Sequence, residues 1–305
     1  MAISIERINY RGWPNCYRIS DSNSQLEVVV TTDVGPRIIR CALAGKANLF
    51  QEFPAEIGQT GGQEWRMYGG HRLWHSPESQ TRTYYPDNHP VEAEIRADGI
   101  VLRQPQETTT GIQKELSITM VAGVSRVRVE HRLINGNCWA VTLAPWAITV
   151  MKTGGTAIVP QYRKVVGEGL LPNRVLALWP YTEMNDPRVE WGSRYIRVTQ
   201  DPERSSAFKI GLSVPEGWLA YHNQDCLFVK QLPYLTGAVY PDGGVNAEIY
   251  TNNRFLEVES LGALQTVEPG DAVTHIENWF VYQNVPKFVN ETDIDDFFNK
   301  NVCIF

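Results

Sequence analysis

Short alternating runs of apolar and polar residues recur along almost the whole 305-residue chain, and they constrain its fold more than any other feature. Such runs are typical of β-strands with one buried face, because successive side chains of a strand point to opposite sides. Clear examples are Leu26–Thr31, Glu92–Arg96 and Arg126–Leu133. Turn signals separate the runs at close intervals, among them Asp98-Gly99, Asn135-Gly136-Asn137, Gly154-Gly155, Pro215-Glu216-Gly217 and Asp242-Gly243-Gly244. The sequence therefore predicts an all-β fold, either a sandwich or a barrel.

Helical patterning is confined to Glu291–Asn299, where acidic residues occupy the first turn. Between Val159 and Arg194, prolines interrupt aromatic and apolar residues, which predicts long loops. Leu176–Trp179 in this region is too apolar for an exposed linker, so we expect it to cover a face of a sheet. Because no low-complexity segment or internal repeat marks a boundary, we predict that residues 1–305 form a single domain.

The composition disfavours several kinds of partner. The net charge is −6 and the 28 lysines and arginines are spread along the chain, so we expect no nucleic acid. Met1–Arg7 is no signal peptide, and no run of about 18 apolar residues occurs, so we expect no membrane. Five scattered cysteines without Cys-x-x-Cys spacing fit buried thiols in a reducing cytoplasm. These features predict a cytoplasmic protein.

The densest collection of reactive side chains lies in Gly69–Glu78. The two glycines permit a turn or a close approach, and Pro77 stops any regular element after Ser76. We expect a strand end or loop at a surface cleft, since so many convergent polar groups are costly to order without a ligand. The alternative is that His71 and His75 are satisfied polar residues packed near Trp74.

Several motifs, in order along the chain, resemble those of galactose mutarotase-like proteins of the aldose 1-epimerase superfamily. They are a Gly-x-Arg strand, a Gly-x-Asn-Leu turn, a Gly-Gly pair and a Leu-Glu strand before a Pro-Gly-Asp turn, found here in Asp33–Ile39, Gly45–Phe50, Gly69-Gly70, Phe255–Ser260 and Val267–His275. The resemblance covers nearly the whole chain, and Gly70–Glu78 with Trp279 is more similar to a bacterial branch than to the mutarotases themselves. It implies a β-supersandwich of two large antiparallel sheets with little helix. Its concave face is expected to hold a cleft formed by Gly69–Glu78, Arg37 and the Glu257 strand.

The resemblance also implies a chemistry for that cleft. A small-molecule carbohydrate would bind, and its anomers would interconvert by acid–base ring opening that requires no metal or organic cofactor. The superfamily's base is a carboxylate late in the chain, which the resemblance places at Glu257. Mutarotases have a histidine after the middle strand region, but Leu143–Met151 contains none. We therefore expect His75, or else His71, to be the acid.

Other side chains are expected to bind the sugar. Glu259 lies on the same side of its strand as Glu257, so the two carboxylates are expected to share the cleft and to raise each other's pKa. The alternative is that both belong to a solvated acidic face of the strand. Arginine forks can bond hydroxyls or an anionic substituent, and an indole can stack on a sugar ring. The alternatives are an exposed salt bridge for Arg37 and a core position for Trp146. The expected substrate-binding residues are Arg37, Arg72, Trp146, Glu78, Glu259, Tyr181 and Asp186.

Other functions compete with an isomerase. A non-catalytic carbohydrate-binding or regulatory module fits the same resemblance, whereas a lyase or glycoside hydrolase accessory domain is disfavoured because the chain has room for little beyond one sandwich. Metal hydrolysis by His71, His75 and Glu78 is disfavoured because the order is not His-Glu-x-x-His and Pro77 precludes a regular helix. The Gly-x-Gly-x-x-Gly and Gly-x-Ser-x-Gly motifs are absent, which leaves nucleotide and acyl chemistry without support.

Overall fold

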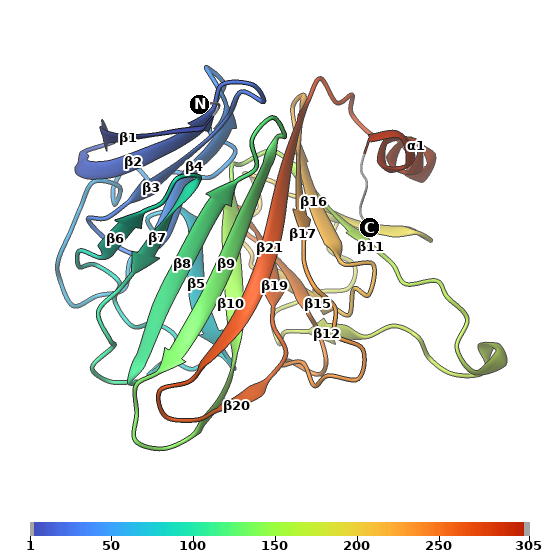
Figure 1. Cartoon of the computed structure of the whole chain (residues 1–305). Helices are drawn as coiled ribbons and strands as arrows, with labels where there is room; N and C mark the ends of the chain where they lie inside the picture. The colour runs from blue at the N-terminus through green and yellow to red at the C-terminus, as the bar shows by residue number, and fades with distance from the viewer. Residues whose placement is uncertain (1–2, 302–305) are drawn as a thin grey trace.

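The computed structural model describes residues 3–301, which fold into two large antiparallel β-sheets (Figure 1). Sheet I has 11 strands, in the spatial order β1 (Ile3–Tyr10), β2 (Trp13–Asp21), β3 (Leu26–Thr31), β4 (Arg37–Leu43), β5 (Gly70–Ser76), β10 (Val141–Met151), β19 (Leu256–Leu261), β18 (Ala247–Thr251), β15 (Phe208–Leu212) and β12 (Leu176–Leu178), with β20 (Gln265–Val267) also paired to β10. Sheet II has 10 strands, in the order β13 (Val189–Trp191), β14 (Tyr195–Thr199), β11 (Thr156–Pro160), β16 (Trp218–Asn223), β17 (Cys226–Gln231), β21 (Ala272–Gln283), β9 (Arg126–Asn135), β8 (Ile112–Met120), β7 (Gly99–Arg103) and β6 (Glu92–Ile95). The all-β prediction is confirmed, in its sandwich form.

Period-two alternation decides which side chains enter the space between the sheets. In β9, Val127, Val129, His131 and Leu133 are buried there, while the alternate residues Arg128, Glu130 and Arg132 are only partly buried. In β19, Leu256 and Val258 join the same apolar core from the opposite sheet. Removing this continuous apolar surface from water is the main favourable contribution to the fold. The alternate residues of sheet I are therefore left to form its outer face.

The predicted C-terminal helix is confirmed as α1 (Glu291–Asn301), and a 3-10 turn, η1 (Gly167–Gly169), lies between β11 and β12. Asn290 caps α1, because its Oδ1 accepts a hydrogen bond from the backbone N–H of Thr292 at 2.8 Å. The helix packs on the outer face of sheet II, where Phe298 stacks on Trp218 with ring centroids 4.0 Å apart. No helix among residues 3–301 is both long and apolar enough to cross a membrane.

β5 is a central strand of sheet I, and the expectation of a strand end or loop over Gly69–Glu78 is wrong. It pairs with β4 on one side and β10 on the other, and all of its residues are buried. The glycines make this possible: Gly69 and Gly70 have φ of 95° and 72°, and a Cβ on Gly70 would lie 2.3 Å from the backbone oxygen of Ile38. As Pro77 predicts, the strand ends at Ser76.

The region between Val159 and Arg194 is rich in loops, as predicted, and the segment between β11 and β12 extends away from both sheets (Figure 1). The expectation that Leu176–Trp179 covers a sheet is wrong. Leu176 and Leu178 belong to the edge strand β12 and are 41% and 46% exposed. β12 ends the strand order of sheet I and pairs with β15 alone, so it has no second neighbour to cover it.

Four cysteines lie within the described residues as free thiols, and the expectation that they are buried holds for only two of them. Cys16 and Cys41 are buried, Cys226 is half-buried and Cys138 is exposed. Cys303 lies outside the described residues.

Candidate functional site

A pocket of about 360 Å³ lies on the outer face of sheet I, over β5, β10, β15 and β19. Its charged lining residues are Arg72, Glu78, Lys209 and Glu257. Its aromatic lining residues are Trp65, Trp74, Tyr84, Trp146, Trp179, Tyr181, Tyr250 and Phe255. A mostly aromatic pocket whose lining includes a few charged groups is the usual form of a small-molecule binding site.

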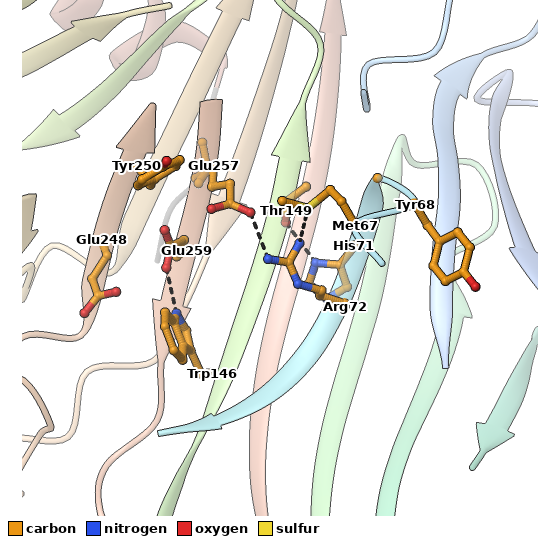
Figure 2. Close-up of polar contacts among 12 residues, drawn as sticks. Met67, Tyr68, His71, Arg72, Trp146, Thr149, Glu248, Tyr250, Glu257 and Glu259 are labelled. Carbon is orange, nitrogen blue, oxygen red and sulfur yellow. Dashed lines mark hydrogen bonds and ion pairs between the residues drawn. The ribbon is translucent and has the colours of Figure 1, made fainter. Parts of the chain in front are cut away.

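Five buried charged residues form what we call the pocket cluster: Arg72, Lys209, Glu248, Glu257 and Glu259. Nη2 of Arg72 donates to Oε1 of Glu257 at 2.9 Å, and Figure 2 shows these two side chains reaching toward each other from β5 and β19. Nζ of Lys209 lies 2.7 Å from Oε2 of Glu248 and 3.2 Å from Oε2 of Glu259. Each cation of the cluster is therefore already paired with carboxylates.

Burial shifts the pKa values of the pocket cluster. Burial raises the pKa of Glu257 above its ordinary value and the charge of Glu259 adds to this, although Arg72 opposes them. Burial likewise raises the pKa of Glu248, against the attraction of Lys209. Burial alone would lower the pKa of Lys209, but the carboxylates of Glu259 and Glu248 outweigh it and raise that pKa. A buried carboxyl group with a raised pKa suits proton transfer near neutral pH.

Several polar atoms around the pocket have no hydrogen-bond partner among the described residues. They are Nε1 of Trp65, Nε of Arg72, Oε1 of Glu248 and Oε1 of Glu259. Buried polar atoms are normally paired, because an unpaired one costs about 1 to 3 kcal/mol. Such atoms gathered around one pocket distinguish it from an ordinary surface depression.

The aromatic walls also contact the cations of the cluster. Cζ of Arg72 lies 4.5 Å from the ring centroid of Trp74, and Nζ of Lys209 lies 4.5 Å from that of Trp146 and 4.6 Å from that of Trp179. Nε1 of Trp146 donates to Oε2 of Glu259 at 2.7 Å (Figure 2). The indole of Trp146 is therefore fixed in place beside the pocket.

Six of the predicted site residues meet at this pocket. Glu257, Arg72, Trp146 and Tyr181 line it, and Glu259 lies beneath, bonded to Trp146. Glu78 stands at the exposed rim and accepts a hydrogen bond from the hydroxyl of Tyr84 at 2.5 Å.

His71 does not reach the pocket, because alternation in β5 turns it inward while Arg72 turns outward. It belongs to a second buried group between the sheets, which we call the interior cluster: His71, His131, Lys230, His275 and Glu277. Nδ1 of His71 lies 2.8 Å from Oγ1 of Thr149, and its Nε2 lies 2.7 Å from Nε2 of His131. Lys230 and Glu277 pair at 2.9 Å. The structure thus matches the alternative of a satisfied core histidine.

His75 lies on the same inward face of β5 as His71. Its Nε2 is 3.8 Å from Oε2 of Glu107, which pairs with Lys114 at 2.6 Å. Burial lowers the pKa of His75, although Glu107 opposes the shift. The strand backbone separates His75 from the pocket, so the expected pairing of this acid with Glu257 is not seen.

Arg37 is also away from the pocket, and it is a buried salt bridge rather than an exposed one. Its Nε and Nη2 donate to both carboxylate oxygens of Asp87, at 2.9 and 3.1 Å. Its remaining N–H groups donate to the backbone oxygens of Arg66, Met67 and Gly69. With its five donors in use, Arg37 fixes the 66–69 loop that leads into β5.

Asp186 holds Arg188 at a different cavity. Oδ2 of Asp186 lies 2.7 Å from Nη2 of Arg188, which lines an 800 Å³ cavity on sheet II. Arg197 lines the same cavity and is paired with Glu190. This cavity is larger than the pocket on sheet I, but the one carboxylate in its lining within residues 3–301, that of Glu190, is exposed. Its lining does not match the acid–base chemistry expected of the site.

Sequence reasoning missed Lys209 and most of the aromatic lining. Lys209 is the one charged residue in Phe208–Leu212, an otherwise apolar strand. A lone charge in such a strand is a signal, because a buried lysine requires a partner. Its partner Glu248 lies 39 positions further along the chain, and no local pattern identifies it.

A metal site is the remaining possibility for the interior cluster. His71, His131 and Glu277 have ligand-type atoms within 4.8 Å of one another. Nδ1 of His131 donates to the backbone oxygen of His275 at 3.0 Å, so its Nε2 accepts the proton of His71. Lys230 already supplies the cation beside Glu277. The geometry is that of a complete hydrogen-bond network. The metal alternative of His71, His75 and Glu78 does not form, because both histidines face inward and Glu78 is at the pocket rim.

Two large antiparallel sheets packed face to face, with a pocket on the outer face of one, form a β-sandwich. No protein-family model matches the chain, and no curated protein matches its sequence. Solved structures do match its fold, with TM-scores above 0.5. The chain is similar to the Slr1438 protein from Synechocystis sp. PCC 6803, at a TM-score of 0.57 and 10% identity over 91% of this chain and 99% of that one.

Two further matches carry the family's name. A galactose mutarotase-like protein from Lactobacillus casei has a TM-score of 0.53 and 11% identity, covering 87% of this chain and 100% of that one. A galactose mutarotase-like protein from Clostridium acetobutylicum has a TM-score of 0.53 and 8% identity, covering 92% and 98%. Identities this low show the fold alone. They confirm the predicted fold class.

Proposed function

We propose that this protein binds a sugar or sugar derivative in the pocket on sheet I and interconverts its anomers by acid–base ring opening. The observation that carries the proposal is Glu257, a buried carboxyl group with a raised pKa that lines an aromatic pocket. Aromatic faces pack on the C–H faces of sugar rings, and carboxyl groups bond their hydroxyls. Two fold neighbours are described as galactose mutarotase-like proteins, which supports the same chemistry.

In this mechanism Glu257 removes the proton of the C1 hydroxyl and another group protonates the ring oxygen. Tyr250 is the best-placed acid, since it lies directly opposite Glu257 in the pairing of β18 with β19. Nδ2 of Asn252 donates to the Tyr250 hydroxyl oxygen at 3.2 Å, which leaves the hydroxyl proton for the ligand. Burial raises the pKa of Tyr250 and keeps it protonated. In this proposal Tyr250 replaces His75.

NMR exchange spectroscopy on a panel of aldoses tests the proposal. The wild type is expected to accelerate anomer exchange of at least one sugar, and Glu257→Gln to slow that exchange by about 10²–10⁴-fold. Tyr250→Phe should reduce it by a similar factor. Glu94→Gln, which changes an exposed carboxylate on β6, is the matched control and should keep full activity. An unchanged rate in Glu257→Gln would falsify the mechanism.

A non-catalytic sugar-binding module is the second candidate. It is favoured by the pairing of Glu257 with Arg72 and by the lack of any histidine in the lining of the pocket within residues 3–301. Saturable binding of a sugar without accelerated exchange, measured on the same panel, would select this candidate.

A further inference from the structure

The charges around the pocket on sheet I are unequal. Four carboxyl groups line it or contact a residue that does: Glu78, Glu248, Glu257 and Glu259. Two cations, Arg72 and Lys209, oppose them. Burial raises the pKa values of Glu248 and Glu257, so a further positive charge beside them would be favoured because it stabilises their ionised forms.

Both cations are already paired with carboxylates, although Nε of Arg72 has no hydrogen-bond partner among the described residues. Arg72 is held by Glu257 at 2.9 Å, and Lys209 by Glu248 at 2.7 Å and Glu259 at 3.2 Å. Lys209 is also enclosed between Trp146 and Trp179. A phosphate or carboxylate on the ligand that took the place of one of these carboxylates would break a buried pair, which is costly.

The pocket has, in contrast, room for one more positive charge. Glu78 has no cationic partner among the described residues and stands at the rim near Tyr84. Arg72, the ion-pair partner of Glu257, also lies over the rings of Trp65 and Trp74. Aromatic faces attract cations, and Tyr181, which is 45% exposed, offers such a ring on the open side. An ammonium group bound in the pocket would therefore contact both carboxylates and aromatic rings.

From this arrangement, and resting on the proposed sugar binding, we infer that the pocket prefers a sugar bearing a protonated amino group over the neutral or anionic sugar of the same shape. The amine would lie between Glu257 and Glu78, with the ring against the aromatic wall. A cation there also stabilises the ionised form of Glu257, which burial otherwise disfavours.

Ligand-observed NMR titration of the full chain tests this with matched ligands: D-glucosamine, D-glucose, N-acetyl-D-glucosamine and D-glucose 6-phosphate, and the corresponding galactose series. Slightly below neutral pH, where the amine is protonated, the amino sugar is expected to bind about tenfold more tightly than its hydroxyl counterpart. The phosphate should bind more weakly than either. Glu257→Gln should bring the ratio between amino and neutral sugar close to one, whereas the control Glu94→Gln should leave it unchanged.

Three outcomes overturn the inference and differ in what they say about sugar binding. If neutral or N-acetylated sugars bind as tightly as the amino sugar, the charge preference is wrong while the proposed function stands. If cyclohexylamine binds as tightly as D-glucosamine, the sugar ring contributes nothing and the proposed sugar specificity fails as well. If no sugar of either series binds, both proposals fail.

Discussion

The pocket cluster and the interior cluster occupy opposite faces of the same strands. Arg72 and His71 are consecutive in β5, yet one faces the pocket and the other the space between the sheets. In β19, Glu257 and Ser260 are divided in the same way, with Ser260 bonded to His275 at 2.7 Å. Both groups of charges are buried, so burial alone does not mark the functional one.

Hydrogen bonding separates the two clusters. Within residues 3–301, no buried side-chain nitrogen or oxygen of the interior cluster lacks a hydrogen-bond partner, whereas Arg72, Glu248 and Glu259 of the pocket cluster each have at least one that does. A fully paired polar network rigidifies a core, and a partly paired one beside a pocket is available to a ligand. The difference supports the proposal that the pocket cluster binds a ligand, whereas the interior cluster stabilises the sandwich.

The largest expected difference comes from one isosteric change made in each cluster. Glu277→Gln leaves Lys230 buried without its carboxylate and should lower the free energy of unfolding by about 3 to 5 kcal/mol. Glu257→Gln also removes the carboxylate partner of buried Arg72, but it should cost less, because Arg72 keeps its contacts with the rings of Trp65 and Trp74 and because the pKa of Glu257 is raised whereas that of Glu277 is lowered. Urea unfolding at neutral pH measures both. Equal losses of unfolding free energy in the two variants would show that the two clusters contribute to stability in the same way.

The pH dependence of stability should have opposite signs in the two clusters. Burial, with the charge of His131, lowers the pKa of His275 from 6.5 to about 3. Between these values the unfolded chain binds the extra proton, so the free energy of unfolding falls as pH decreases, by up to about 1.4 kcal/mol per pH unit. The pKa of Glu257 is raised from 4.5, so there the folded chain binds the extra proton and stability falls as pH increases from 4.5 through the folded pKa.

Two variants separate these contributions in unfolding experiments at a series of pH values. His275→Gln should flatten the loss of stability on the acid side, where burial also lowers the pKa values of His71 and His131. Glu277 adds to that loss only below its unfolded pKa of 4.5, because its folded pKa is lowered. Glu257→Gln should flatten the decline above 4.5 instead. If both variants act on the same side, the assignment of charge states is wrong.

The sequence predicts the fold well because fold depends on periodicity and turn chemistry, which are local. Leu26–Thr31 forms β3 as expected, and Glu257 and Glu259 share a face by the same rule of alternation. In the Gly45–Phe50 turn, Oδ1 of Asn48 accepts hydrogen bonds from the backbone N–H groups of Cys41 and Phe50 at 3.1 and 3.0 Å, which gives this residue of the motif a structural role.

The site is harder to predict, because alternation gives two faces without saying which one meets the pocket. Every residue of β5 is buried, so its polar pattern could not show that Arg72 and Trp74 face outward and His71 and His75 inward. Applying alternation to β5 as well as to β19 would have separated the histidines from Arg72. Lys209 required knowledge of which strand neighbours β19 and β18, and that pairing joins segments about 40 residues apart in sequence.

The smallest expected effect concerns Tyr84 and Glu78 at the rim of the pocket, which is more exposed to solvent than either cluster. The hydroxyl of half-buried Tyr84 donates a hydrogen bond to Glu78. Tyr84→Phe removes this hydroxyl and should weaken sugar binding by about threefold. A hydrogen bond at a partly solvated site contributes about 0.5 to 1.5 kcal/mol. Stability should barely change, since Glu78 is solvated and the ring of Tyr84 keeps its contacts with Trp65 and Trp74. Tyr85→Phe, outside this pocket, is the matched control and should leave binding unaffected. A loss in Tyr84→Phe as large as that in Glu257→Gln would mean that the rim, rather than the buried cluster, holds the ligand.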